Sequence, residues 1–229
     1  MATTLSVIVP MLNEAAALPV LCAQLAALAA QGVEVILVDG GSSDGSADMA
    51  EQMAQHMGFA VVRSARGRAV QMNAGAARAR SDVLLFLHAD TRLPAAAPAL
   101  LTALDAQAVA WGRFDVTIEG RPAMLKVVAA LMNWRSRITG IATGDQAIFM
   151  TRKAFDAVGG FPVQPLMEDI EITSRLRRLA RPVCLAERVT TSGRRWEQRG
   201  VWRTIVLMWR LRWAYWRGVP ASDIAKAYR

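Results

Sequence analysis

The sequence has few cysteines and no long uncharged apolar run. Its two cysteines, Cys22 and Cys184, lie far apart without the spacing of metal ligands. We therefore expect no disulfide framework and a reducing compartment, with both residues buried as small apolar side chains. No stretch of about 18 uncharged apolar residues is present, which argues against a membrane-spanning helix.

Three other patterns are missing. The N-terminus runs almost directly into an apolar segment and lacks the basic region of a signal peptide, so we expect a cytoplasmic protein. The chain has no internal repeat and no low-complexity linker. No Gly-x-Gly-x-x-Gly pattern follows the first apolar segment, which weighs against a dinucleotide-binding fold.

Positive charge is concentrated at one end of the chain. The 229 residues are 53% hydrophobic and carry a net charge of +8. Residues 1–110 contribute −3, residues 111–174 contribute 0 and residues 175–229 contribute +11. Five of the seven tryptophans lie between Trp196 and Trp216. A basic, aromatic tail on a near-neutral body indicates an anionic partner, either nucleic acid, phosphate or a membrane surface.

The first half of the sequence predicts a parallel sheet. Four short apolar runs, separated by helix-like stretches, lie at 5–9, 33–38, 59–62 and 83–87. Continuously apolar strands are expected when helices cover both faces of a sheet. We expect the first helix to begin near Asn13 and Glu14. The second should be capped by Ser43 or Asp44, and another should begin at Pro94.

The second half is less regular. Its expected elements are a strand, a helix, a short strand and an amphipathic helix, at 111–119, 122–138, 147–150 and 168–180. We predict one α/β domain at 1–195, with a regular α/β half at 1–110 and an irregular half at 111–195. A basic, Trp-rich helical tail should follow at 196–229.

Polar residues follow three of the expected strands, where open α/β sheets bind ligands. Glu14 follows the first strand, Asp39 the second, and His88 and Asp90 the fourth. An aspartate at a strand end can bind a nucleobase or a ribose hydroxyl, although the Asp39 loop could equally be only a tight turn. His88 and Asp90 could hold a divalent cation together with ligand phosphates, or His88 could be structural.

An acidic segment begins the expected helix at 168–180. Its carboxylates are Glu168, Asp169 and Glu171. Carboxylates in the first turn suit the helix dipole, and this structural role alone can account for Glu171.

In this order, the segments resemble the family 2 glycosyltransferases of the GT-A fold. SVIVPMLNEAAALP is similar to the family's first strand and donor-binding turn, and VEVILVDGGSSDGS to its second strand and loop. GRAVQMNAGAARARSDVLLFLHADTRLP resembles the stretch that leads to the metal-binding DxD motif. GDQAIFMTRKAFDAVGGFPVQPLMEDIEITSRLRR resembles the acceptor-side block. HADT and TTSGRRWEQRGVWRT further resemble a bacterial subgroup, the radical SAM/selenodomain-associated transferases.

The resemblance implies that residues 1–110 are a nucleotide-binding half with the donor site and that residues 111–195 are an acceptor half. Pro10 and Glu14 match the turn that lines the nucleotide pocket. Asp39 matches the carboxylate that reads the base, usually uracil, and Arg68 matches a basic residue near the nucleotide or diphosphate. The donor implied by these matches is a nucleotide-sugar, with a UDP-sugar favoured.

The resemblance also implies a metal ion and a general base. Asp90 matches the second aspartate of DxD, which binds a divalent cation, Mn²⁺ or Mg²⁺. His88 replaces the first aspartate and is either a second metal ligand, which would favour Mn²⁺, or a ribose contact. Asp169 matches the general base and Glu168 its orienting neighbour.

Three residues are expected near the acceptor or the diphosphate. They are Gln146, Arg195 and Trp196. Ser192 replaces the glutamine of the Gln-x-x-Arg-Trp motif of processive members, which argues against polymer synthesis.

The tail predicts an amphipathic helix at 201–217. On a helical wheel, three arginines form one stripe and four tryptophans the adjacent one: Arg203, Arg210 and Arg217, then Trp202, Trp209, Trp213 and Trp216. Such a helix suits peripheral contact with a membrane interface, or it packs on the domain with its arginines in water. No nucleic-acid recognition motif is present.

The sequence therefore predicts a metal-dependent, inverting glycosyltransferase. It should move a sugar from a nucleotide-sugar to a lipid-linked or hydrophobic acceptor at the inner face of the cell membrane. Two alternatives remain, a degenerate nucleotide-binding module that recruits partners to membranes, and a sugar-phosphate nucleotidyltransferase. The second would need a basic, Gly-rich loop after the first strand, which Pro10 to Glu14 does not provide.

Overall fold

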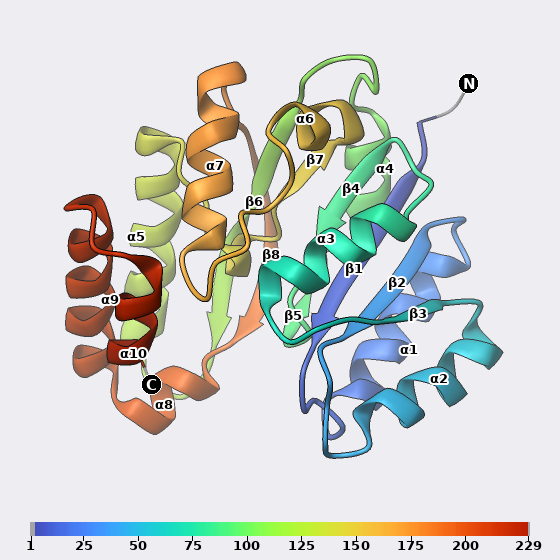
Figure 1. Ribbon diagram of the computed structural model, residues 1–229, viewed down its shortest axis with the longest axis horizontal. Helices are drawn as coiled ribbons and strands as arrows, with labels where there is room; N and C mark the ends of the chain where they lie inside the picture. Colours follow the sequence, from blue (N-terminus) through green and yellow to red (C-terminus); the bar gives the residue numbers. More distant parts are fainter. Residues whose placement is uncertain (1–2, 229) are drawn as a thin grey trace.

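The computed structural model describes residues 3–228, which contain one eight-stranded sheet (Figure 1). The strand order is β3-β2-β1-β4-β7-β6-β8-β5. All strands except β7 and β5 run in one direction, so the predicted mostly parallel sheet is confirmed. The strands are β1 (Leu5–Met11), β2 (Glu34–Asp39), β3 (Ala60–Arg63), β4 (Val83–Phe86), β5 (Thr91–Arg92), β6 (Trp111–Glu119), β7 (Phe149–Thr151) and β8 (Val183–Ser192).

Helices cover both faces of the sheet (Figure 1). Alternate residues of β1 enter two different cores, Val7 the first and Ile8 the second. The first core includes residues of α1, α2, α4 and α5, and the second includes residues of α3, α6 and α7. These helices are α1 (Leu18–Ala29), α2 (Ser46–Met57), α3 (Arg68–Arg78), α4 (Ala97–Thr102), α5 (Met124–Thr139), α6 (Arg152–Ala157) and α7 (Glu168–Leu179). The continuously apolar strands follow from this double cover.

The first helix begins later than predicted, at Leu18 rather than near Asn13 and Glu14. The chain there forms a turn that is bonded to Ser42 and to Ser46, the first residue of α2. Asn13 donates its N–H to Ser42 Oγ at 2.9 Å, and Glu14 donates its N–H to Ser46 Oγ at 2.9 Å. Asn13 also has a positive φ of 56°, outside the helical region. The positive φ keeps Asn13 out of a helix, and Ser42 and Ser46 hold this turn from further along the chain.

Two other predicted helix starts are shifted. The N-cap of α2 is Gly45, and neither Ser43 nor Asp44 occupies that position. Asp44 Oδ1 still accepts the N–H of Ser46 at 3.0 Å, so it satisfies a donor of the first turn. After Pro94 the chain makes one turn before α4 begins at Ala97.

The acceptor half is more regular than predicted, because β8 extends the sheet beside β6. The two strands are parallel, with a register shift between Phe114 and Asp115. The shift interrupts the alternation of inward and outward side chains, and β8 carries Glu187 and Arg188 in its middle. Because of these two features, the alternation of apolar and polar residues does not predict β8. The short β5 pairs with the other edge of β8.

The tail forms three helices, α8 (Arg194–Arg199), α9 (Val201–Trp216) and α10 (Ala221–Tyr228). The predicted helix at 201–217 is confirmed by α9. A small third core joins α9 and α10 to the residue before α7 through Leu211, Ile224 and Met167. Within residues 3–228, no helix combines the length and the apolar character needed to cross a membrane.

Asn133 of α5 completes the open edge of β6. It accepts the N–H of Val116 at 2.8 Å and donates to the Val116 carbonyl at 3.0 Å. Replacing Asn133 by alanine leaves both buried backbone groups without a partner. We expect a loss of about 2–4 kcal/mol in the free energy of unfolding, measured by urea denaturation. Leu131→Ala, on the exposed side of the same helix, should change it by less than about 0.5 kcal/mol, and equal losses in the two variants would contradict this role.

Candidate active site

The carboxyl ends of β1, β2 and β4 lie at one edge of the sheet, as their parallel pairing requires. The short 3-10 turn η1 (Gly144–Gln146) and the first turn of α7 reach the same region. Open α/β sheets bind ligands at such an edge. Several of the residues predicted from the sequence are found along it, among them Asp39, His88 and Asp169.

Asp39 organises its own loop at the end of β2. Its side chain is buried, and Oδ2 accepts the N–H of Gly41 at 2.8 Å and the N–H of Ser42 at 3.1 Å. Pro10 lies beside Val38 in the register of β1 and β2. Both residues therefore stand where the nucleotide is expected, and a direct contact between Asp39 and a base stays a prediction.

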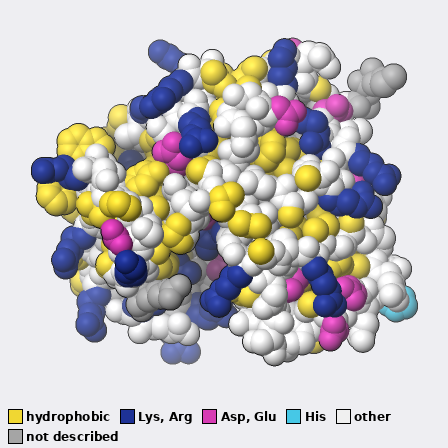
Figure 2. Space-filling view, in the orientation of Figure 1, with side chains coloured by type: hydrophobic (Ala, Val, Ile, Leu, Met, Phe, Trp, Pro, Cys, Tyr) yellow, Lys and Arg dark blue, Asp and Glu magenta, His cyan; other side chains and the backbone are white. Residues whose placement is uncertain are grey.

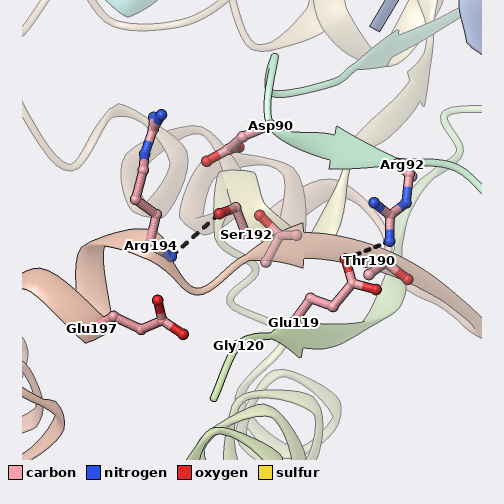
Figure 3. A pocket seen from close by; sticks show the side chains of 9 residues that line it. Asp90, Arg92, Glu119, Gly120, Thr190, Ser192, Arg194 and Glu197 are labelled. Atoms are coloured by element: carbon pink, nitrogen blue, oxygen red, sulfur yellow. Dashed lines mark hydrogen bonds and ion pairs between the residues drawn. The ribbon is translucent and has the colours of Figure 1, made fainter. Parts of the chain in front are cut away.

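Glu14, Asp90 and Arg194 form a charged group next to a cavity. Burial raises the pKa of Glu14, Arg194 opposes this rise, and the nearby carboxylates of Asp90 and Asp44 add to it. Figure 3 shows the Arg194 side chain extending from α8 on the same side as Asp90. The cavity has a volume of about 360 Å³ and is also lined by residues of β5, β6 and β8. The cavity wall thus carries both a cation, Arg194, and a carboxylate, Asp90.

His88 is held by η1. Its Nδ1 lies 3.2 Å from Asp145 Oδ1, which places the ring proton on Nδ1. Its Nε2 lies against Gly144, where a Cβ atom would overlap the ring. Burial would raise the pKa of Asp145, but the hydrogen bond and charge of His88 and the charges of Arg68 and Arg195 outweigh it, so the pKa is lowered.

Asp169 lies in a constrained position at the start of α7. Its Oδ2 accepts the N–H of Gly144 at 2.9 Å, and its Oδ1 accepts the N–H of Ile170 at 2.8 Å. Arg68 Nη1 donates to the buried Glu168 at 3.3 Å. Burial and the negative charge of Glu168 raise the pKa of Asp169 to about 6, against the two N–H groups and Arg68. A carboxylate with this pKa is suited to accept a proton near neutral pH.

The three residues predicted near the acceptor occupy different places. Gln146 is fully buried and donates to Ser136 Oγ at 3.0 Å, so it anchors η1 to α5 and we assign it no direct acceptor contact. Trp196 is partly buried against the first core. Arg195 is exposed, and its guanidinium donates to the Tyr228 hydroxyl and lies over the Tyr228 ring.

Three residues of the site are missing from the prediction. Asp145 is the partner of His88, Arg194 lines the cavity beside Asp90, and Tyr228 reaches Arg195 from α10. Asp145 lies inside the acceptor-side block that resembles the family, and its charge could have marked it. Which of Arg194 and Arg195 lines the cavity could not be predicted, because neighbouring residues of a helix point in directions about 100° apart. The answer therefore depends on where α8 begins.

The sequence matches the family model of glycosyl transferase family 2 over residues 6–159. The chain belongs to this family. Among curated relatives, it is 27% identical over 215 residues to a beta-monoglucosyldiacylglycerol synthase of Synechocystis, covering 83% of this chain and 45% of that protein. It is 37% identical over 91 residues to a PGL/p-HBAD biosynthesis glycosyltransferase of Mycobacterium tuberculosis, covering 38% and 36%. The chain thus spans less than half the length of these relatives.

Solved structures of other proteins share the fold of this family 2 chain. The mannosyltransferase PcManGT of Pyrobaculum calidifontis, solved with GDP-Man and Mn²⁺, superposes with a TM-score of 0.65 at 22% identity, covering 93% of this chain and 61% of that one. TarS of S. aureus superposes with a TM-score of 0.63 at 18% identity, covering 83% and 60%. The predicted GT-A fold is therefore confirmed.

The family 2 site fits a divalent cation only in part. Asp90 offers an exposed carboxylate, and Mg²⁺ often uses one or two protein carboxylates together with the phosphates of a ligand. Within residues 3–228, no three His, Cys, Asp or Glu side chains are grouped as a ready metal site. Both nitrogens of His88 face η1, so we assign the metal role to Asp90 and a positioning role to His88.

Proposed function

We propose that this chain is a metal-dependent, inverting glycosyltransferase that moves a sugar from a nucleotide-sugar to a hydroxyl of a lipid-linked or hydrophobic acceptor. The observation that carries the proposal is Asp169, a half-buried carboxylate with a raised pKa that two backbone N–H groups hold in place. Asp169 lines one hollow together with Arg68 and His88. His88 in turn lies two residues before Asp90 in the sequence. The narrower likeness to the radical SAM/selenodomain-associated subgroup stays a prediction.

The chemistry assigns one step to each part of the site. Asp169 accepts the proton of the acceptor hydroxyl as the oxygen forms a bond to the anomeric carbon. The bond from that carbon to the diphosphate breaks on the opposite face, so the configuration inverts and the nucleoside diphosphate leaves with the electron pair. Arg68 and Arg194 supply positive charge near the leaving group. A divalent cation held by Asp90 would supply further charge stabilisation there.

Two observations support the choice of substrates. PcManGT is solved with GDP-Man and TarS with UDP-GlcNAc, so nucleotide-sugars occur in proteins of this fold. The name of the Synechocystis relative describes a glycolipid product, which supports a lipid acceptor. We propose UDP as the nucleotide, with Asp39 at the base, and a peripheral position at the cytoplasmic membrane face through residues 201–217.

A donor screen tests the proposal. Calorimetry with UDP, GDP, ADP and CDP, with and without Mn²⁺ or Mg²⁺, should show metal-dependent binding of one nucleotide. The matching nucleotide-sugars should then be hydrolysed slowly without acceptor, as measured by nucleotide release. Binding without any turnover would favour a degenerate nucleotide-binding module, and no binding in any combination would reject both functions.

The pH dependence of transfer should reveal Asp169. The base must be deprotonated, so activity requires a pH above its pKa of about 6. We expect kcat/KM to be level above that pH and to fall by about tenfold per pH unit below it. Glu168→Gln removes a negative charge that raises this pKa, so the fall should move to lower pH. An unchanged profile in that variant would show that another group controls it.

A further inference from the structure

Exposed apolar side chains are concentrated on two helices, α5 and α9. Of fourteen large hydrophobic residues exposed in the described part of the chain, nine lie on these helices. They are Val127, Leu131, Trp134 and Ile138 on α5, and Trp202, Val206, Trp209, Trp213 and Trp216 on α9. The four tryptophans of α9 are 61–79% exposed and Trp134 is 64% exposed. Exposed apolar patches of this kind mark interaction sites.

Each set lies along one face of its helix. Both sets follow steps of three and four residues, which repeat a helical face. The opposite side of α5 enters the first core through Leu125 and Val128, and the α9 residues Val201 and Ile205 pack against the same core. Both helices lie on the same side of the molecule (Figure 1). Figure 2 shows apolar side chains bordered by Lys and Arg along that margin.

The two helices and their neighbours in the sequence carry charge of one sign. Residues 120–144 and 198–222, which include the two helices, contain nine Lys and Arg and no Asp or Glu. On α9, Arg203 and Arg210 are exposed, and the Arg217 guanidinium lies 5.2 Å from the centre of the Trp213 ring. Tryptophan and arginine together suit the depth of lipid headgroups, where the ring is buried and the cation meets phosphate.

We propose that α5 and α9 together form a face that binds the surface of an anionic lipid bilayer. The proposed membrane contact through residues 201–217 is thereby extended to α5, which lies outside the Trp-rich tail. A second copy of the chain is a poorer occupant, because a twofold contact would place two acid-free, basic faces against each other. The anionic headgroups of a bilayer instead complement the charge.

The lipid-binding face lies close to the proposed catalytic residues. Leu211 of α9 packs in the third core with Met167, which directly precedes Glu168 and Asp169. The Tyr215 hydroxyl donates to Glu171 Oε2 at 3.1 Å. About one helix diameter, roughly 10 Å, thus separates the bilayer surface from the start of α7. This position suits an acceptor that is anchored in lipid. The link between the lipid-binding face and the acceptor rests on the proposed function.

Vesicle cosedimentation tests the proposal without donor or acceptor. The full chain should bind vesicles of phosphatidylcholine that contain phosphatidylglycerol, and bind phosphatidylcholine alone much more weakly. The triple variant Leu131→Ser, Trp134→Ser and Ile138→Ser should bind about 100-fold more weakly. A matched control, Val20→Ser with Val163→Ser, removes exposed apolar side chains elsewhere and should bind as the unchanged chain does. Circular dichroism and nucleotide calorimetry verify that each variant is folded.

Three results would overturn the proposal. They are no binding of the unchanged chain to either vesicle, unchanged binding by the α5 variant, and a dimer in sedimentation velocity that the α5 variant abolishes. Vesicle binding by a chain that transfers no sugar would instead refute the proposed function alone. Transfer to a water-soluble acceptor by a chain that does not bind vesicles would refute the lipid-binding face and the lipid acceptor, and would leave the glycosyltransferase activity in place.

Discussion

Replacement of Asp169 by asparagine is expected to lower sugar transfer by about 10³-fold while nucleotide-sugar binding is retained. The amide oxygen can still accept the N–H of Gly144 and only the N–H of Ile170 loses its acceptor, so the turn should largely keep its shape. The amide cannot accept the proton of the acceptor hydroxyl, so the loss should appear in kcat. Nucleotide release measures the rate, and calorimetry measures donor affinity.

Glu171→Gln is the matched control for this variant. It removes one carboxylate charge from the same turn of α7, where Glu171 bonds Tyr215 and Arg175 rather than Gly144. Its rate should stay within roughly threefold of the unchanged chain, because partly exposed ion pairs contribute little. Equal losses in both variants would point to damage to α7, and full activity in the Asp169 variant would place the base elsewhere.

Asp90→Asn should remove the metal dependence of both donor binding and transfer. Asp90 is the exposed carboxylate at the cavity wall, and we assign no other protein ligand to the cation. Loss of the stabilised charge on the leaving diphosphate should lower the rate by about 10²–10³-fold. Titration of Mn²⁺ against donor affinity and rate checks this expectation.

Asp48→Asn offers the comparison for Asp90. Asp48 is an exposed aspartate on α2, paired with Arg63 at 3.2 Å, and its loss changes the net charge equally. Metal affinity and rate should be unchanged in that variant. A normal metal response in the Asp90 variant would show that the cation binds other residues or is not required.

The sheet could be predicted where local pattern and burial agree. The apolar runs of β1, β2 and β4 are buried on both faces and stand out in the sequence. β8 could not be found in the same way, because a register shift and two charged residues break its pattern. The start of α1 also escaped prediction, because Asn13 adopts a positive φ in a turn that Ser42 and Ser46 bind from further along the chain.

The candidate site shows the same limit. Asp90 and Asp169 could be proposed from residue type and order along the chain. The pairing of His88 with Asp145 joins residues 57 positions apart, so no local spacing indicates it. The apolar face of α5 could have been read from its helical spacing, but only the fold shows that its other side is already buried and that α9 packs against the same core.

Gly144 contacts both His88, on the donor side of the site, and Asp169, the proposed base. It donates its N–H to Asp169, and its Cα faces His88 so closely that a side chain would not fit between them. One peptide unit therefore sets the separation between the donor side, next to β4, and the proton acceptor on α7. Because packed groups move together, a displacement of His88 by a bound donor would shift Asp169 as well. Binding of the donor would then also align Asp169 for proton transfer.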